Sequence, residues 1–176
     1  TFTNVTISDN SAVGAGDGAY NINASASYFR NVLIANNVGG DCVNLSGSGT
    51  VSYYSLYEDA TNACGIVHNV DGNIVGTDPL LGPLQNNGGT TETHKPLANS
   101  PIVNKGTNSA CPTTDQRGIT RPQGGTCDIG AVEIEITSLT LQSLDIKDGH
   151  VLESGENTNV GGSILSAGTT FHIGDD

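Results

Sequence analysis

The densest group of side chains that could do chemistry is the consecutive trio Asp115, Gln116 and Arg117. Such a trio can clamp a sugar or a carboxylate, because the guanidinium donors of arginine match two acceptor oxygens at once. It can equally be an internal ion pair that orders a loop, with Glu133 or Asp128 as a further partner. We favour this structural interpretation, because the trio lies in a loop that two cysteines enclose.

Catalysis on a polysaccharide would need a different arrangement of residues. Hydrolysis uses carboxylates that face each other about 5–10 Å apart across the sugar, and eliminative cleavage uses a basic residue beside a calcium-binding acidic face. Arg30 is a candidate base, but no acidic residue accompanies it in its segment. The sequence therefore predicts no catalytic residue and no enzymatic activity.

Candidate metal ligands are spread along the chain. The histidines are His68, His94, His150 and His172. Acidic and amide residues occur at expected turns, at Asp9–Asn10, Asp71–Asn73, Asp148–Gly149 and Asp175–Asp176. The scattered histidines argue against a transition-metal site, and the loop spacing of an EF-hand is absent. We predict no cofactor and no metal site, with calcium bound at these turns as the alternative.

The cysteines predict an oxidising compartment. The chain has four, Cys42, Cys64, Cys111 and Cys127. Their spacing is not that of a zinc site, and an even number of cysteines in a chain rich in Asn and Thr fits a secreted or cell-surface protein. Of the possible connectivities, we expect the sequential one, Cys42 with Cys64 and Cys111 with Cys127.

Composition predicts an all-β protein. The chain has 176 residues, 24 of them Gly, with no Met or Trp and a net charge of −12. Gly, Asn, Ser and Thr are poor in helix interiors and common in turns. The negative charge disfavours nucleic acid as a partner, and no apolar run is long enough to span a membrane. The missing initiator Met predicts a mature or excised piece.

A ten-residue block occurs twice, as TFTNVTISDN at 1–10 and YFRNVLIANN at 28–37, an offset of 27 residues (28 − 1). Related apolar patterns return at 140–149 and near 171–175. One β-prone strand per period of this length indicates a solenoid of stacked parallel strands. The expected stacked pairs are Val5 with Val32, Ile7 with Ile34, and Asn4 with Asn31 as an amide ladder.

The predicted fold is therefore a right-handed parallel β-helix with a disulfide-clipped, loop-rich insertion. Residues 1–37 would form β-helix coils. Residues 38–133, which hold every cysteine and every proline, would form the loop-rich segment packed on the β-helix. Residues 134–176 would resume the coils.

Longer segments carry a resemblance to a family. DPLLGPLQNNGGTTETHKPLANSPIVNKG at 78–106 and CPTTDQRGITRPQGGTCDIGAVE at 111–133 resemble the closing segment of the choice-of-anchor Q domain family, and NVTISDNSA at 4–12 is similar to its coils. These are bacterial surface proteins with a parallel β-helix body, similar to polymorphic outer-membrane protein repeats. The resemblance covers roughly 1–133 and implies a surface location and a structural or adhesive role. The chain departs from the family pattern by continuing after Glu133, without a visible anchoring signal.

The predicted function is a structural extracellular segment of a surface fibre, stalk or adhesin. Copies would assemble head to tail by stacking strands. The expected contact residues are Phe2, Val5 and Ile7 at one end and Phe171 and Ile173 at the other. The alternative is a carbohydrate-binding or polysaccharide-degrading β-helix with surface glycans as partners. Five Tyr and three Phe are few for the aromatic groove that this alternative would favour.

Overall fold

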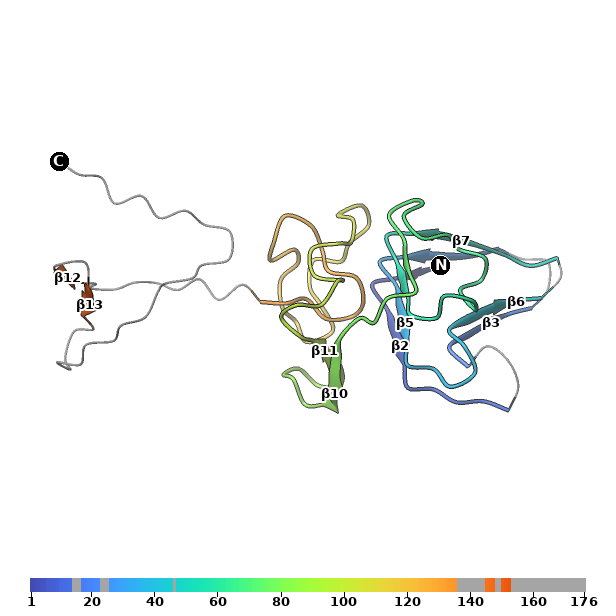
Figure 1. Ribbon diagram of the computed structural model, residues 1–176, viewed down its shortest axis with the longest axis horizontal. Coiled ribbons are helices and arrows are strands. Elements are labelled where there is room, and N and C mark those ends of the chain that lie inside the picture. The colour runs from blue at the N-terminus through green and yellow to red at the C-terminus, as the bar shows by residue number, and fades with distance from the viewer. Residues whose placement is uncertain (14–16, 23–25, 46, 136–144, 148–149, 153–176) are drawn as a thin grey trace. The chain divides into compact units, whose positions relative to one another are not determined.

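The computed structural model describes residues 1–13, 17–22, 26–45, 47–135, 145–147 and 150–152 (Figure 1). The chain divides into two units, residues 1–136 and 137–176. No helix among the described residues is long and apolar enough to cross a membrane.

The first unit is built from short parallel strands, as the composition predicts. They are β1 (Phe2–Thr3), β2 (Thr6–Ser8), β3 (Ala19–Asn21), β4 (Ala26–Arg30), β5 (Leu33–Ala35), β6 (Cys42–Asn44), β7 (Gly49–Tyr53), β8 (Leu56–Tyr57) and β9 (Ile74–Val75). They form the parallel sheets β1-β4-β7, β2-β5-β8-β9 and β3-β6. Figure 1 shows β2 beside β5 and β3 beside β6. Strands that are distant in sequence therefore become neighbours.

The strand register is the one that the repeat predicts. Phe2 pairs with Phe29 and Ile7 with Ile34, and the Asn31 amide donates to Asn4 Oδ1 at 3.1 Å across the same 27 residues. Asn4 and Asn31 both have positive φ, 51° and 53°, a conformation that Asn tolerates better than most residues. The repeated Asn thus bends the chain between sheets and bonds to its counterpart.

Parallel pairing continues beyond Asn37, the expected end of the stacked strands. Leu56 pairs with Leu33 and Ile74 with Leu56. The separations between neighbouring strands shorten, as the Val32–Ser55 contact at 23 residues and the Ser55–Asn73 contact at 18 residues illustrate. A search for a fixed period of 27 residues could not reveal these strands. The segments that connect them are shorter, although the strands still pair in parallel.

Both faces of the sheet β2-β5-β8-β9 are covered. Val32 and Ile34 belong to one buried cluster, which also includes Phe29 and Tyr57. Leu33 belongs to a second cluster on the opposite side, because alternate residues of a strand point to opposite faces. The second cluster draws its other members from β5, β8 and the later loops, namely Ala35, Leu56, Ile102 and Ile129.

The loop-rich segment is shorter than the expected 38–133, because the parallel strands β6 to β9 occupy the first part of that range, and it begins after Val75. It contains an antiparallel pair, β10 (Leu81–Gln85) and β11 (Thr93–Pro96), and is closed by the disulfide Cys111–Cys127. The other disulfide, Cys42–Cys64, joins the base of β6 to the turn after β8. Both expected cysteine pairs are therefore present.

The second unit differs from the expected resumption of parallel coils. Its described strands, β12 (Asp145–Lys147) and β13 (His150–Leu152), pair antiparallel. The Asp-Gly dipeptide between them in the sequence is typical of a tight hairpin turn, and this local signal competes with the apolar pattern. Phe171 and Ile173, the expected contact residues at this end, lie outside the described residues.

Candidate functional site

The predicted trio Asp115, Arg117 and Glu133 comes together in the loop-rich segment. Arg117 Nη2 lies 2.8 Å from Asp115 Oδ2 with both side chains buried, and Arg117 also donates to the backbone oxygen of Glu133. The Glu133 amide in turn donates to Asp115 Oδ2 at 2.9 Å. The three residues thus tie the start of the closed loop to the chain that leaves it.

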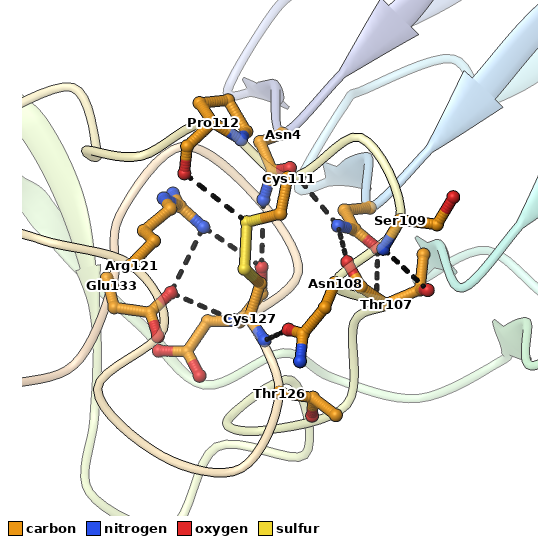
Figure 2. Close-up of a disulfide and its surroundings, with 12 residues drawn as sticks. Asn4, Thr107, Asn108, Ser109, Cys111, Pro112, Arg121, Thr126, Cys127 and Glu133 are labelled. Carbon is orange, nitrogen blue, oxygen red and sulfur yellow. Dashed lines mark hydrogen bonds and ion pairs between the residues drawn. A yellow bond between two sulfur atoms is a disulfide. The ribbon is translucent and has the colours of Figure 1, made fainter.

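A second ion pair, which the sequence did not indicate, lies beside the trio. Arg121 Nη1 is 3.1 Å from Glu133 Oε2, and both side chains are buried. Glu133 was named as a possible partner of the trio, with Asp128 as the alternative. Glu133 contacts Arg117 through its backbone oxygen. Its carboxylate is held by Arg121 instead (Figure 2).

Every described contact of the Glu133 carboxylate is with a donor. Oε2 accepts from Arg121 and from the backbone N–H of Asp128 at 2.9 Å, and Oε1 accepts from the backbone N–H of Gln123 at 2.9 Å. Arg121 Nη2 donates to the Gly130 oxygen at 2.9 Å. A buried charge pair needs such additional hydrogen bonds to offset the loss of water.

The asparagine ladder attaches this cluster to the strands. The Asn4 amide donates to the backbone oxygen of Asp128 at 3.1 Å. The side-chain amide of Asn31 exchanges two hydrogen bonds of 2.8 Å with the Thr107 backbone. The backbone N–H of Gly130 donates to the backbone oxygen of Asn31. Figure 2 shows Asn4 and Thr107 in the surroundings of the Cys111–Cys127 bridge. The loop-rich segment is thereby bonded to the residues that repeat.

An open pocket of about 300 Å³ lies against the cluster and is lined in part by Asn4, Asp115, Gln116 and Arg121. A sugar clamp would need free acceptors or donors here. The Asp115 oxygens already accept four hydrogen bonds from Arg117, Ile119 and Glu133. This geometry supports the structural interpretation of the cluster.

Burial and hydrogen bonding act in opposite directions on the buried carboxyl groups. Burial alone would raise the pKa of Asp115, but donors from Glu133, Ile119 and Arg117 hold that pKa below its usual value. For Asp128, burial prevails and raises the pKa, against the hydrogen bonds from Asn104 and Ile134. The two carboxyls therefore differ because their donors differ.

The candidate metal ligands and the candidate base Arg30 each make contacts of their own. Among the described residues there is no group of three His, Cys, Asp or Glu side chains that could hold a metal ion. Asp9 instead lies 3.3 Å from His94, and His68 accepts from the Val75 amide. Arg30, the candidate base, lies over the ring of Tyr53.

Two of the three expected contact residues of the first end, Phe2 and Ile7, lie together, whereas Val5 lines a different pocket. Phe2 and Ile7 line an open pocket of about 320 Å³ with Ala19, Tyr20 and Phe29 among its other residues. Phe2 is 45% exposed, although it packs against Phe29 with ring centroids 5.3 Å apart. Apolar side chains of the outermost strands therefore remain partly open to water.

Comparison with protein-family models, with curated proteins and with solved structures gives no match for this chain. Its function must therefore be argued from its own contacts.

Asp41 provides a test of how burial shapes stability. It is buried, and burial is the largest of the effects that raise its pKa above 3.8. As the pH falls through the raised pKa, the folded state takes up a proton before the unfolded state does, so stability rises. As the pH is lowered from about 7 to about 4, we expect the free energy of unfolding of the parent, measured in urea, to increase relative to that of Asp41→Asn.

Asp59→Asn is the matched control for Asp41→Asn. Hydrogen bonds from Thr61, first among them its amide, lower the pKa of Asp59 below 3.8. Because the folded pKa lies below that of the unfolded state, the parent should keep a constant difference from Asp59→Asn down to about pH 5 and lose stability relative to it below that pH. A parent that gains no stability relative to Asp41→Asn over the same range would contradict the raised pKa of Asp41.

Proposed function

We propose that this chain is a structural extracellular protein, a segment of a surface fibre, stalk or adhesin built as a right-handed parallel β-helix. The parallel register of β1 with β4 and of β2 with β5 supports the proposal, since parallel crossovers are right-handed in nearly all proteins. The disulfides support an oxidising, extracellular compartment. The sequence resemblance to the choice-of-anchor Q domain family supports membership of that family.

The single observation that carries the structural role is that the buried charged and amide side chains bond to one another and to the backbone. The Arg121–Glu133 pair and the Asp115–Arg117 pair are buried and bonded within the protein. The asparagine ladder bonds the strands to the loop-rich segment. The proposal therefore includes no enzymatic activity, because these carboxylates serve internal contacts and line no paired-carboxylate cleft.

End-to-end stacking would use the outermost strands. Among the described residues, β1, β2 and β3 each pair on one side only, with β4, β5 and β6. A free parallel edge is a template for a further strand. The partly exposed Phe2 and Tyr20 would be covered by the strands of a second copy, and repeated stacking yields a fibre.

Substitution at this edge tests the assembly. We expect the parent to form oligomers that grow with concentration in light scattering, and Phe2→Lys/Tyr20→Lys to remain monomeric, because lysine on an edge blocks strand addition. Leu97→Lys, an exposed apolar position in the loop-rich segment, is the control and should assemble like the parent. A parent that stays monomeric at high concentration would refute assembly.

A second candidate function, carbohydrate binding, is favoured by one observation. Of the five tyrosines of the chain, the four that are exposed are Tyr20, Tyr28, Tyr53 and Tyr54. Exposed aromatic rings that combine an apolar face with a polar tip are enriched at binding surfaces.

A further inference from the structure

The outer face of the sheet β1-β4-β7 presents aromatic side chains. Phe29 and Ser52 are buried and point inward, so their neighbours in β4 and β7 point outward. Tyr28 is 49% exposed and Tyr53 is 38% exposed. Tyr28 pairs with Val51, so Tyr53, two residues further along β7, lies at a diagonal position on the same face.

Arg30 completes this outer face. It pairs in register with Tyr53, and its guanidinium carbon lies 5.8 Å from the centroid of the Tyr53 ring. The ion pairs and side-chain hydrogen bonds of the described residues do not include its guanidinium, whereas Arg117 and Arg121 are buried in ion pairs. The donors of Arg30 are therefore available to a ligand.

The charge on this face is opposite to that of the whole chain. Strands β1, β4 and β7, with the sequences FT, ASYFR and GTVSY, contain Arg30 as their one charged residue. The chain as a whole carries −12. An anionic ligand would be repelled by most of such a protein, and this face combines a positive group with the absence of carboxylates from its strands.

We propose that this face, named here the Tyr28–Tyr53 face, binds an acidic polysaccharide. Sugar rings stack on Tyr28 and Tyr53, and a carboxylate of the polysaccharide accepts a charge-assisted bidentate bond from Arg30. The ring of Tyr53 holds the guanidinium in place through a cation–π contact. A neutral glycan would leave the arginine donors to water, and nucleic acid would bring many phosphates against an acidic protein.

Binding at this face is independent of end-to-end stacking. Stacking would use the edges of β1, β2 and β3. Tyr28 and Arg30 belong to β4, the middle strand of the sheet β1-β4-β7, and Tyr53 belongs to β7, at the edge of that sheet opposite β1. A chain that stays monomeric can therefore still bind the polysaccharide. The failure of one proposal is distinguishable from the failure of the other.

Calorimetry with a hyaluronan hexasaccharide, whose alternate rings carry a carboxylate, tests the inference on the full chain. We expect the parent to bind and Tyr53→Ala to lose about tenfold in affinity or more, the equivalent of one moderate contact. Arg30→Gln should lose at least as much. Tyr20→Ala, a tyrosine as exposed as Tyr28 but on β3, is the matched control and should bind like the parent.

The carboxyl-reduced hexasaccharide isolates the charge. The parent should bind it about tenfold more weakly, and Arg30→Gln should weaken that binding no further, because the partner of the arginine is gone. Absence of binding to the acidic hexasaccharide would overturn the proposal. Equal binding of the reduced form, equal losses in Tyr20→Ala and Tyr53→Ala, or tighter binding of a single-stranded DNA oligomer would overturn it too. Circular dichroism of each variant establishes that the strands are intact.

Discussion

Glu133→Gln is expected to lower the free energy of unfolding by about 3–5 kcal/mol, the cost of removing one partner from a buried charge pair. The carboxylate accepts from Arg121 and from the amides of Asp128 and Gln123. A glutamine of the same shape turns an NH₂ group toward at least one of these donors. It also leaves the Arg121 charge buried beside a neutral group.

Glu135→Gln is the matched control for this loss. Glu135 lies 3.5 Å from Arg117 and its side chain is half-exposed, so its pairing is screened by water. The loss there should stay under about 0.5 kcal/mol. Urea unfolding at neutral pH gives both free energies. If Glu133→Gln unfolded at the same urea concentration as Glu135→Gln, the Arg121–Glu133 pair would contribute little to stability.

A compensating double variant separates lost charge pairing from lost volume. Arg121→Met/Glu133→Leu removes both charges and keeps apolar bulk. Replacement of both partners of a buried pair is often neutral or stabilising, although here the Asp128 and Gln123 amides would lose an acceptor. We expect the double variant to recover part of the stability that Glu133→Gln loses. No recovery would assign the loss to the backbone donors rather than to the unpaired arginine.

Local identity and local spacing explain which features the sequence predicted. Asn4 and Asn31 are identical residues at a fixed offset, so their ladder was visible in the repeat. Asp115 and Arg117 are two residues apart, so their contact was visible as a cluster. Cys42 and Cys64 were paired from their order along the chain.

The features that sequence analysis missed depend on distance along the chain. The strands β8 and β9 follow at shorter separations than the repeat, so periodicity does not reveal them. The Arg121 and Glu133 side chains are 12 residues apart and meet only because the Cys111–Cys127 loop folds back. Packing of Ile102 and Ile129 against β5 has no local signal, since both residues lie in loops that are far from β5 along the chain.

Val32→Asp is expected to prevent folding or to cost more than about 4 kcal/mol, because it buries a carboxylate without a partner. Val32 has no exposed surface and packs with Phe29, Ile34 and Tyr57 inside the first cluster. Its amide already donates to Ser55 Oγ at 3.0 Å, so the main chain cannot move aside without breaking the contact with the next strand. A protonated aspartic acid at this position would still lack an acceptor among these apolar side chains.

Val38→Asp makes the same chemical change six positions later and is the control for Val32→Asp. Val38 is 81% exposed, so its carboxylate would stay in water and the variant should unfold within about 0.5 kcal/mol of the parent. Urea unfolding followed by circular dichroism compares the two. A small effect at Val32 would mean that Val5 and Val32 do not share the interior, and the stacked register of β2 on β5 would then be wrong. A large effect at Val32 alone ties the stability of the unit to the side of β5 that faces Phe29 and Tyr57.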